Sequence, residues 1–238
     1  MNNKKGRLIV IEGACDGIGK STQLEMLKKE FKSDCYTHHF PSYGFASANM
    51  VNLFLKKKLG DLKDIPDEAA ELYYAIDREY VWRNYLKKEI DEGKTVILDR
   101  YTTSSFIYQT LKCQDEDAKK DMIAQIQALE YGYLKIGDPD LVIFLNGDFA
   151  TVTRLRLART DNAGFQKDIF EAKTETQRQL YENAQFVSNY LKWYQVMVTE
   201  NDNMRSEEAI HEDIMRLVRK KWIYPRIYLI SLATMFLI

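Results

Sequence analysis

Glu12-Gly13-Ala14-Cys15-Asp16-Gly17-Ile18-Gly19-Lys20-Ser21-Thr22 lies between two segments that indicate regular structure. The apolar run Leu8–Ile11 before it predicts a buried parallel strand, and residues 23–29 after it carry apolar side chains at helical spacing. A strand, a glycine-rich turn ending in Gly-Lys-Ser, and a helix together predict a P-loop. Glycines let successive backbone N–H groups converge on phosphate oxygens, and the helix N-terminus faces the same anion. In such a loop Lys20 reaches the β- and γ-phosphates of a nucleotide, and the Ser21 hydroxyl can ligate Mg²⁺.

The spacing of this loop departs from the usual pattern. Four residues normally separate the first glycine from the glycine before lysine, and counting back from Gly19 puts Ala14 in that first place. Either Ala14 is tolerated there or the loop carries one extra residue. A glycine-rich turn without a ligand is the alternative interpretation, which the flanking strand and helix disfavour.

Bulk composition narrows the class of protein. A chain of 238 residues with 45% hydrophobic and 29% charged residues fits one α/β domain with a large core. The net charge of −1 provides no general basic field, so we expect no nucleic-acid partner. The three cysteines (15, 35 and 113) have no metal-ligand spacing, and together with the absence of a signal-peptide pattern they favour reduced thiols in the cytoplasm.

The C-terminal residues 222–238 are unusually apolar. This run is shorter than the roughly 20 residues that a bilayer-spanning helix requires. We expect an extension packed on the body of the protein or on another subunit, with attachment to a membrane surface as the less favoured alternative.

Apolar runs alternate with helical patterns along the chain, which predicts an α/β fold: a five-stranded parallel sheet with helices on both faces and a short lid. Ligands of such sheets bind at the carboxyl ends of the strands. The predicted strands are Leu8–Ile11, Cys35–Phe40, Thr95–Leu98, Leu141–Leu145 and Gln195–Val198. The predicted helices are Ser21–Phe31, Asp67–Glu92, Asp115–Tyr133, Asp168–Trp193 and Ser206–Lys221.

A second candidate motif is Asp99-Arg100-Tyr101, directly after a predicted strand. A carboxylate at that strand end can face Ser21 and hold Mg²⁺ directly or through water, while the Arg100 fork can bind a second phosphate. An Asp-Arg pair that merely caps a helix is the alternative, and the neighbouring P-loop makes it less favoured.

Three arginines, Arg154, Arg156 and Arg159, precede the segment Thr160–Gly164. Close to phosphates they would neutralise the charge that builds on a transferred group, and the segment could close as a lid. A solvated basic helix face is the alternative interpretation.

A further candidate lies on the long predicted helix, where Tyr74 and Arg78 are four residues apart and share a face. The ring can stack on a base while the guanidinium hydrogen-bonds the edge of that base. The alternative is a core aromatic with a surface salt bridge from Arg78 to Asp77 or Glu79.

Taken together, these separated motifs resemble thymidylate kinase. The resemblance covers about residues 7–221 and is weaker beyond the lid. It rests on the P-loop, Phe40-Pro41, Tyr74 to Arg78, Asp99-Arg100-Tyr101 with Ser104, Tyr108 and Gln109, Pro139-Asp140-Leu141, and the arginine-bearing lid. It implies transfer of a phosphoryl group from ATP to dTMP with Mg²⁺, giving dTDP and ADP, by a homodimer.

The resemblance also implies roles for individual residues. The ATP phosphates and Mg²⁺ would be bound by Gly17, Ile18, Gly19, Lys20, Ser21 and Thr22, with Asp99 near the metal. Asp16 would accept a hydrogen bond from the sugar 3′-hydroxyl, and Arg100 would hold the dTMP phosphate. Thymine would stack on Tyr74 and be read by Arg78, with Phe40, Ser104, Ser105, Gln109 and Tyr181 completing the nucleoside pocket. Tyr108 would crowd the 2′ position and favour deoxyribose.

Within the family, some members carry a basic residue in the phosphate loop, where this chain has Gly17 and Ile18. The chain therefore resembles the bacterial type, whose catalytic arginine comes from the lid. Arg154 would stack near adenine, and Arg156 or Arg159 would reach the transferred phosphate. We expect one kinase domain over residues 1–221, with the lid at about 150–168, followed by the extension 222–238.

Two other functions are compatible with a P-loop. A deoxynucleoside kinase must deprotonate a neutral hydroxyl, and its family places a glutamate after the second strand, where this chain reads Phe40-Pro41-Ser42. A protein that binds nucleotide without catalysis is the other alternative, and the irregular loop leaves it open.

Overall fold

A five-stranded parallel sheet forms the centre of the computed structural model, which describes residues 6–15, 17–61, 64–154 and 174–222. The strand order is β2-β3-β1-β4-β5, which confirms the predicted parallel sheet. The three central strands, β3, β1 and β4, are nearly continuous apolar runs, because both faces of the sheet are covered by helices, whereas the edge strands β2 and β5 carry polar residues. The strands are β1 (Arg7–Gly13), β2 (Cys35–His39), β3 (Thr95–Asp99), β4 (Leu141–Asn146) and β5 (Tyr194–Met197).

Strand register brings the two sequence motifs to one edge of the sheet. Ile11 of β1 lies opposite Asp99 of β3, so the P-loop and the Asp-Arg-Tyr segment leave adjacent strands side by side. On the other side of β1, Gly13 lies opposite Leu145 of β4. The carboxyl ends of the central strands therefore place both motifs where α/β sheets bind ligands.

The helices and turns connect these strands in chain order. Those of the first half are α1 (Lys20–Phe31), η1 (Lys32–Asp34), η2 (Ala46–Ala48), α2 (Asn49–Leu55), α3 (Asp67–Val81), η4 (Trp82–Leu86) and α4 (Lys87–Asp91). Those of the second half are α5 (Thr102–Tyr108), α6 (Glu116–Gln127), η5 (Ala128–Tyr133), α8 (Thr174–Tyr190) and α9 (Glu207–Trp222), with a hairpin of β6 (Thr199–Glu200) and β7 (Asn203–Met204) between β5 and α9.

The predicted helices form, with internal details that the sequence did not show. The helix predicted over residues 67–92 is one run in which η4 is a π-helical turn between α3 and α4, and η5 extends α6 in the same way. Asp115 caps α6 by accepting a hydrogen bond from the Ala118 N–H, as its residue type favours. The short helices α2 and α5 and the β6–β7 hairpin were not predicted. Residues 168–173 of another predicted helix, and the extension 223–238, lie outside the described residues.

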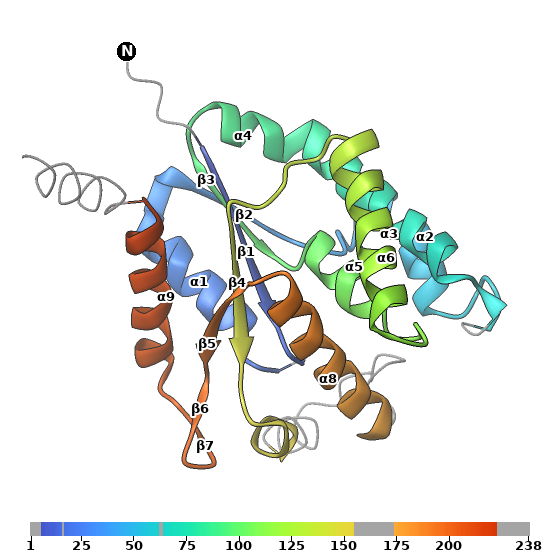
Figure 1. Ribbon diagram of the computed structural model, residues 1–238. Coiled ribbons are helices and arrows are strands. Elements are labelled where there is room, and N and C mark those ends of the chain that lie inside the picture. The colour runs from blue at the N-terminus through green and yellow to red at the C-terminus, as the bar shows by residue number, and fades with distance from the viewer. Residues whose placement is uncertain (1–5, 16, 62–63, 155–173, 223–238) are drawn as a thin grey trace, which may run out of the picture.

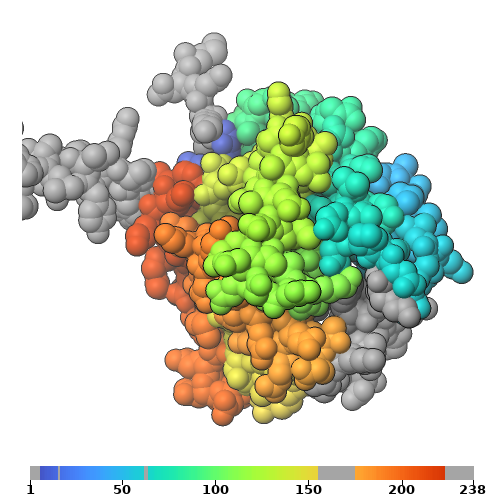
Figure 2. All heavy atoms as spheres, turned by 45° about the vertical axis from the view of Figure 1, so that its right-hand side comes forward, coloured from blue at the N-terminus to red at the C-terminus, as the bar shows by residue number. Residues whose placement is uncertain are grey.

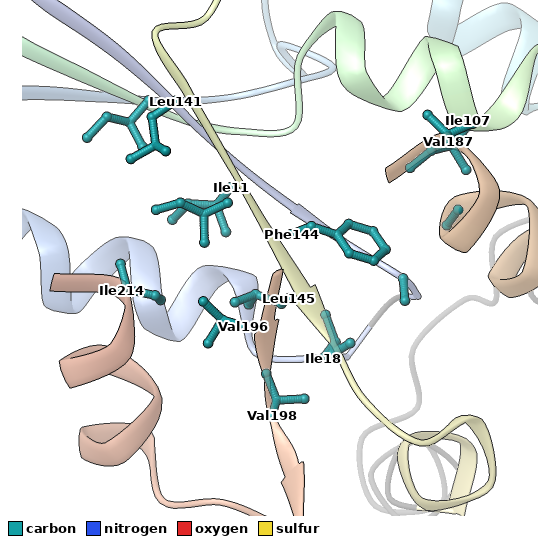
Figure 3. Close-up of a cluster of buried hydrophobic side chains, with 14 of the residues drawn as sticks. Ile11, Ile18, Ile107, Leu141, Phe144, Leu145, Val187, Val196, Val198 and Ile214 are labelled. Atoms are coloured by element: carbon teal, nitrogen blue, oxygen red, sulfur yellow. The ribbon is translucent and has the colours of Figure 1, made fainter. Parts of the chain in front are cut away.

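Helices cover both faces of the sheet (Figure 1): α1 and α9 lie on one face, and α3 to α6 with α8 lie on the other. Alternation along β1 distributes its side chains, since Ile9 and Ile11 join one buried cluster while Leu8 and Val10 join the other. Figure 3 shows Ile214 of α9 and Phe144 of β4 within the first cluster. No helix in the described part of the chain is long and apolar enough to cross a membrane.

Candidate functional site

The P-loop is fixed by glycine geometry at its end and by close packing at its start. Gly19 caps the N-terminus of α1 with a backbone φ of 102°, a left-handed conformation that favours glycine, and Lys20 follows it buried. A Cβ on Gly13 would come within 2.6 Å of the Ile18 Cγ2 atom, so only glycine fits there. Ile18 itself lies in the core near Leu145 (Figure 3) and anchors the loop.

Ala14 fits the position where the usual motif has its first glycine. Its side chain is buried, and its N–H donates to the Leu145 carbonyl oxygen at 3.1 Å. The alanine therefore continues the β1–β4 ladder by one residue. A methyl group at this position is accommodated, as the first of the two sequence alternatives requires.

Arg100 has a backbone φ of 66°, which is uncommon outside glycine and costs of order 1–3 kcal/mol. Its N–H donates to the Ile11 carbonyl oxygen at 3.1 Å, which ties this strained residue to the P-loop strand. The guanidinium lies 5.7 Å from the centre of the Tyr108 ring, and its Nη1 donates to the Tyr108 hydroxyl at 3.3 Å and the Ser104 hydroxyl at 3.5 Å. Strain of this kind is typical of residues positioned for function.

Asp99 has a carboxyl group suited to a metal ion. Its Oδ2 lies 3.4 Å from the Ser21 hydroxyl and 3.3 Å from Nδ1 of His39. Its buried Oδ1 has no hydrogen-bond partner among the described residues. Burial raises the pKa of this carboxyl, but the hydrogen bond from His39 and the charge of Lys20 outweigh burial, so the pKa lies below its ordinary value. The carboxylate therefore stays ionised, with Oδ2 beside Ser21 and His39 and with Oδ1 available to a ligand.

These oxygens fit Mg²⁺, which binds through one or two protein ligands together with water and substrate phosphates. Within the described ranges, no group of three His, Cys, Asp or Glu side chains could hold a metal alone. A metal at Asp99 and Ser21 would therefore need the phosphates of a nucleotide to complete its coordination.

Glu12 joins the P-loop strand to the helix that follows Arg100. Its fully buried carboxylate accepts hydrogen bonds from the Thr103 hydroxyl at 2.9 Å and the Ser104 hydroxyl at 2.6 Å, both on α5. Since Ser104 also accepts from Arg100, the P-loop strand and the Asp-Arg-Tyr segment are held in one hydrogen-bonded chain. No motif in the sequence indicated this role of Glu12.

One pocket of about 360 Å³ lies over these segments. It has a phosphate end at the P-loop and Asp99-Arg100, and an aromatic end at Phe40 and Tyr74. Its lining residues are Gly17, Gly19, Lys20, Ser21, Thr22, His39, Phe40, Pro41, Tyr43, Leu55, Tyr74, Arg78, Asp99, Arg100, Tyr101, Ser104, Ser105, Tyr108 and Gln109.

At the aromatic end, Arg78 is buried and held by two carboxylates. Its Nε and Nη2 donate to the two carboxylate oxygens of Glu130 at 2.6 and 2.7 Å, and Nη2 also donates to Glu71 at 2.8 Å. The surface salt bridge to Asp77 or Glu79 considered as the alternative is therefore wrong. Asp77 instead accepts from the Ser42 N–H at 2.7 Å and fixes the loop after Phe40.

The sequence profile of the thymidylate kinase family matches residues 11–214, which include the whole pocket lining. The chain belongs to the thymidylate kinase family. Its reaction is that of the family, the phosphorylation of dTMP to dTDP with ATP.

Individual thymidylate kinases from distant organisms align along nearly the whole chain. The probable thymidylate kinase of Pyrococcus abyssi is 28% identical over 218 residues, covering 90% of this chain and 97% of that protein. The thymidylate kinase of Schizosaccharomyces pombe is 29% identical over 224 residues, covering 90% and 92%. The solved structure of thymidylate kinase from Candida albicans has the same fold, with a TM-score of 0.68 at 21% identity over 91% of this chain and 92% of that one.

Most residues that the thymidylate kinase resemblance singled out lie together in the pocket. Ile18 is in the core instead, and two others lie away from the lining. The Tyr181 hydroxyl donates to the Gly147 carbonyl oxygen, and Arg154 donates to the Asp202 carbonyl oxygen on the β6–β7 hairpin. Asp16, Arg156 and Arg159 lie outside the described residues, so their roles stay predictions.

Sequence reasoning missed several members of this thymidylate kinase pocket. His39, Tyr43 and Leu55 line it without having been singled out. His39 and Tyr43 lie on either side of the Phe40-Pro41 motif, just where a predicted strand ends. That position could have identified them as candidate pocket residues. Leu55 is the last residue of helix α2, which was not predicted, and no local sequence pattern indicated that Leu55 would line a pocket.

Proposed function

We propose that this pocket binds dTMP and the phosphates of ATP end to end, and that the γ-phosphoryl group passes between them. The observation that carries the proposal is that Lys20, at the N-terminus of α1 behind the glycine-rich turn, and Arg100, at the end of β3, line the same pocket. Lys20 would hold the β- and γ-phosphates with the N–H groups of Gly17, Gly19, Ser21 and Thr22. Arg100, braced by Tyr108, would hold the dTMP phosphate.

Little chemistry is required of the protein beyond this positioning. A nucleoside monophosphate has its second pKa near ~6, so the attacking oxygen is already ionised at neutral pH. Asp99 is the only carboxylate lining the pocket among the described residues, and it is held at the phosphate end by Ser21 and His39. This arrangement supports a phosphate acceptor rather than the neutral hydroxyl of a deoxynucleoside.

Mg²⁺ would be held by Asp99 and Ser21 and would supply charge neutralisation between the two phosphate groups. The protein's own share of that task is to keep the Asp99 carboxylate ionised and correctly oriented. The hydrogen bond from His39 to Oδ2 supports both the ionisation and the orientation of Asp99. It also leaves Oδ1 available to the metal ion.

Tyr74, Phe40 and Arg78 would bind the base. Tyr74 is braced edge-on by Phe54, with ring centroids 6.2 Å apart. Arg78 lines the pocket, and its Nη1 makes no hydrogen bond to any described residue. Nη1 would therefore donate a hydrogen bond to a carbonyl oxygen of the base. Ser105 and Gln109 would flank the base, while Tyr108 would restrict the 2′ position of the sugar.

We infer that transition-state charge is neutralised by lid arginines, as in the bacterial type, through Arg156 or Arg159, with Arg154 near adenine. Gly17 and Ile18, which carry no positive charge, support this because the P-loop then supplies no basic residue besides Lys20. Arg154 itself donates a hydrogen bond to the Asp202 carbonyl oxygen in the β6–β7 hairpin.

A homodimer is supported by an exposed apolar ridge. Leu72, Ile76 and Tyr80 of α3 recur every four residues and are 48%, 54% and 36% exposed, with Leu53 of α2 beside them at 40%. Helices α2 and α3 form one flank of the molecule (Figure 2), where a second copy could pack the same ridge against this one.

The three cysteines form no disulfide, which is consistent with the cytoplasm.

Product analysis tests the proposed reaction directly. Purified protein is given ATP, Mg²⁺ and, separately, dTMP, dUMP, dCMP, dGMP or thymidine, and the products are separated by ion-exchange chromatography. We expect dTDP and ADP from dTMP and no product from thymidine. Phosphorylation of thymidine would establish a deoxynucleoside kinase instead, and nucleotide binding without any product would establish a non-catalytic protein.

Two substitutions address the residues. Lys20→Ala and Arg100→Ala should each lower kcat/KM by a factor on the order of 10²–10³ while the thermal midpoint stays near that of the wild type. Lys87→Ala is the matched control, since Lys87 is exposed on α4 and forms an ion pair with Asp91 on the same helix. Full activity in either pocket variant would contradict the assigned roles.

A further inference from the structure

Two buried carboxylates enclose the guanidinium of Arg78 and leave one of its nitrogens available. Glu130 binds Nε and Nη2 in a two-point fork, and Glu71 accepts a second hydrogen bond from Nη2 at 2.8 Å. The side chains of all three residues are at most 3% exposed. The Ser105 hydroxyl also lies 2.8 Å from Nη2. The direction of Nη1 is therefore set by contacts on the opposite edge of the guanidinium.

The two carboxylates come from different helical runs. Glu71 lies two turns before Arg78 on α3, while Glu130 lies in the π-helical turn η5 after α6. Glu130 is held in turn by the Thr102 hydroxyl at 3.2 Å, on the helix that follows Arg100. The Gln109 amide, which lines the pocket, donates to Glu71 at 3.4 Å. The cluster thus connects two pocket-lining helices, α3 and α5, with η5 behind them.

Its charges balance only if one carboxyl carries a proton. Two carboxylates facing one guanidinium would leave a net negative charge in a buried place, which is unfavourable. Burial and the neighbouring Glu130 charge raise the pKa of Glu71 to about 8, although Arg78 opposes this. Burial lowers the Arg78 pKa, but the two glutamates raise it further, so the guanidinium stays charged. Glu71 is therefore the carboxyl of this cluster that carries a proton at neutral pH, beside the charged Arg78.

We propose that Glu130 and Glu71 are positioning residues for base selection, which hold the Arg78 fork so that Nη1 presents a fixed donor to a carbonyl on the pyrimidine edge. A guanidinium can only donate, so a base with an amino group at that place leaves both donors without acceptors. By fixing the position of Arg78, Glu130 and Glu71 thereby favour the binding of 4-oxo over 4-amino pyrimidine nucleotides. This inference rests on the proposed function, since it assigns the partner of Arg78 to the base.

A purely structural ion cluster would stabilise the fold without affecting which base is bound. The two possibilities differ in a measurable way. If Glu130 and Glu71 orient Arg78, weakening their hydrogen bonds changes KM for the monophosphate and the preference between bases. KM for ATP and the rate of phosphoryl transfer should then stay close to those of the wild type. If the cluster is only structural, the thermal midpoint changes but the preference between dTMP and dCMP does not.

The test compares Glu130→Gln, Glu71→Gln and the control Glu182→Gln, an exposed glutamate on α8. Steady-state kinetics with dTMP and dCMP are combined with calorimetric titration of dTMP in the absence of ATP. For Glu130→Gln we expect dTMP to bind at least about tenfold more weakly, with dTMP/dCMP discrimination reduced by a similar factor and KM for ATP within about twofold. Glu71→Gln should have a smaller effect in the same direction, because glutamine replaces a carboxyl that is already neutral.

An unchanged dTMP/dCMP ratio in a folded Glu130→Gln enzyme would overturn the inference while leaving the proposed function intact. If that variant does not fold, Glu130→Asp keeps the charge and shortens the side chain by one methylene. It should then show the same loss of discrimination in graded form, and full discrimination in that variant would also overturn the inference. Absence of dTDP from the wild-type enzyme would instead refute the proposed function itself.

Discussion

Replacing Glu71 with glutamine should remove a pH dependence from the stability of the fold. Glu71 is almost fully buried between Arg78 and Glu130, and its pKa is raised from 4.5 to about 8 by burial and by the Glu130 charge. In the unfolded chain this carboxyl ionises near its ordinary value. Over the interval between those two pH values, the native protein therefore holds a proton that the unfolded chain has released.

The sign and size of the effect follow from this difference. A group whose pKa is raised by folding stabilises the protein fully below its unfolded pKa, and that contribution declines as the pH rises toward its folded pKa. Each pH unit across the interval lowers the free energy of unfolding by about 1.4 kcal/mol. Between about pH 4.5 and about pH 8 the total loss reaches up to about 5 kcal/mol. Glutamine does not titrate, so the variant lacks this slope.

Urea unfolding at intervals across that pH range, followed by circular dichroism, measures the effect. The free energy of unfolding of the wild type minus that of Glu71→Gln should fall by several kcal/mol toward high pH. Other titrating groups cancel in this difference, and Glu182→Gln should run parallel to the wild type. Parallel curves for Glu71→Gln as well would mean that Glu71 is ionised throughout, and the proposed charge state of the Arg78 cluster would be refuted.

Three further substitutions probe other parts of the structure. Tyr108→Phe removes the acceptor 3.3 Å from Arg100 Nη1 and should lower kcat/KM for dTMP about 2–10-fold with KM for ATP unchanged; equal kinetics would exclude that bracing. Ile76→Asp places a charge on the exposed ridge of α3 and should yield monomers in light scattering, whereas a persistent dimer would locate the interface elsewhere. Gly137→Ala would bring a Cβ within 2.1 Å of the Trp82 ring and should lower stability by about 1–3 kcal/mol, seen as a reduced thermal midpoint; an unchanged midpoint would contradict the tight packing.

The strands were predictable because a parallel sheet covered on both faces requires continuous apolar runs. Leu8–Ile11 and Leu141–Leu145 show that pattern directly; the structure extends the first to Arg7–Gly13 and the second by one residue, to Asn146. Helix α5 was missed because its sequence, Thr-Thr-Ser-Ser-Phe-Ile-Tyr, has weak intrinsic helix propensity. Its Thr103 and Ser104 hydroxyl groups are held by Glu12, which lies about 90 residues earlier in the chain, and no local pattern reports such a contact.

The pocket was predictable where a motif sits at a strand end, and less so where partners are remote. Lys20 lies just beyond the turn that follows β1, and Asp99 and Arg100 lie at the end of β3, so their grouping follows from the parallel sheet. The partners of Arg78 could not be read in the same way. Sequence offered the adjacent acidic residues, but the structure uses Glu71 and Glu130, and the π-helical turn that carries Glu130 leaves no distinct signature in the hydrophobic spacing.

Pairing of β1 with β3 in a single register has a consequence for how the enzyme matures. Lys20 and Arg100 are far apart along the chain, and they line one pocket because Ile11 is aligned with Asp99. A slip by one residue would turn Asp99 and its neighbours to the opposite side of the sheet. Substrate present during refolding would thus be captured only by correctly aligned molecules, and by mass action it would draw the population toward them.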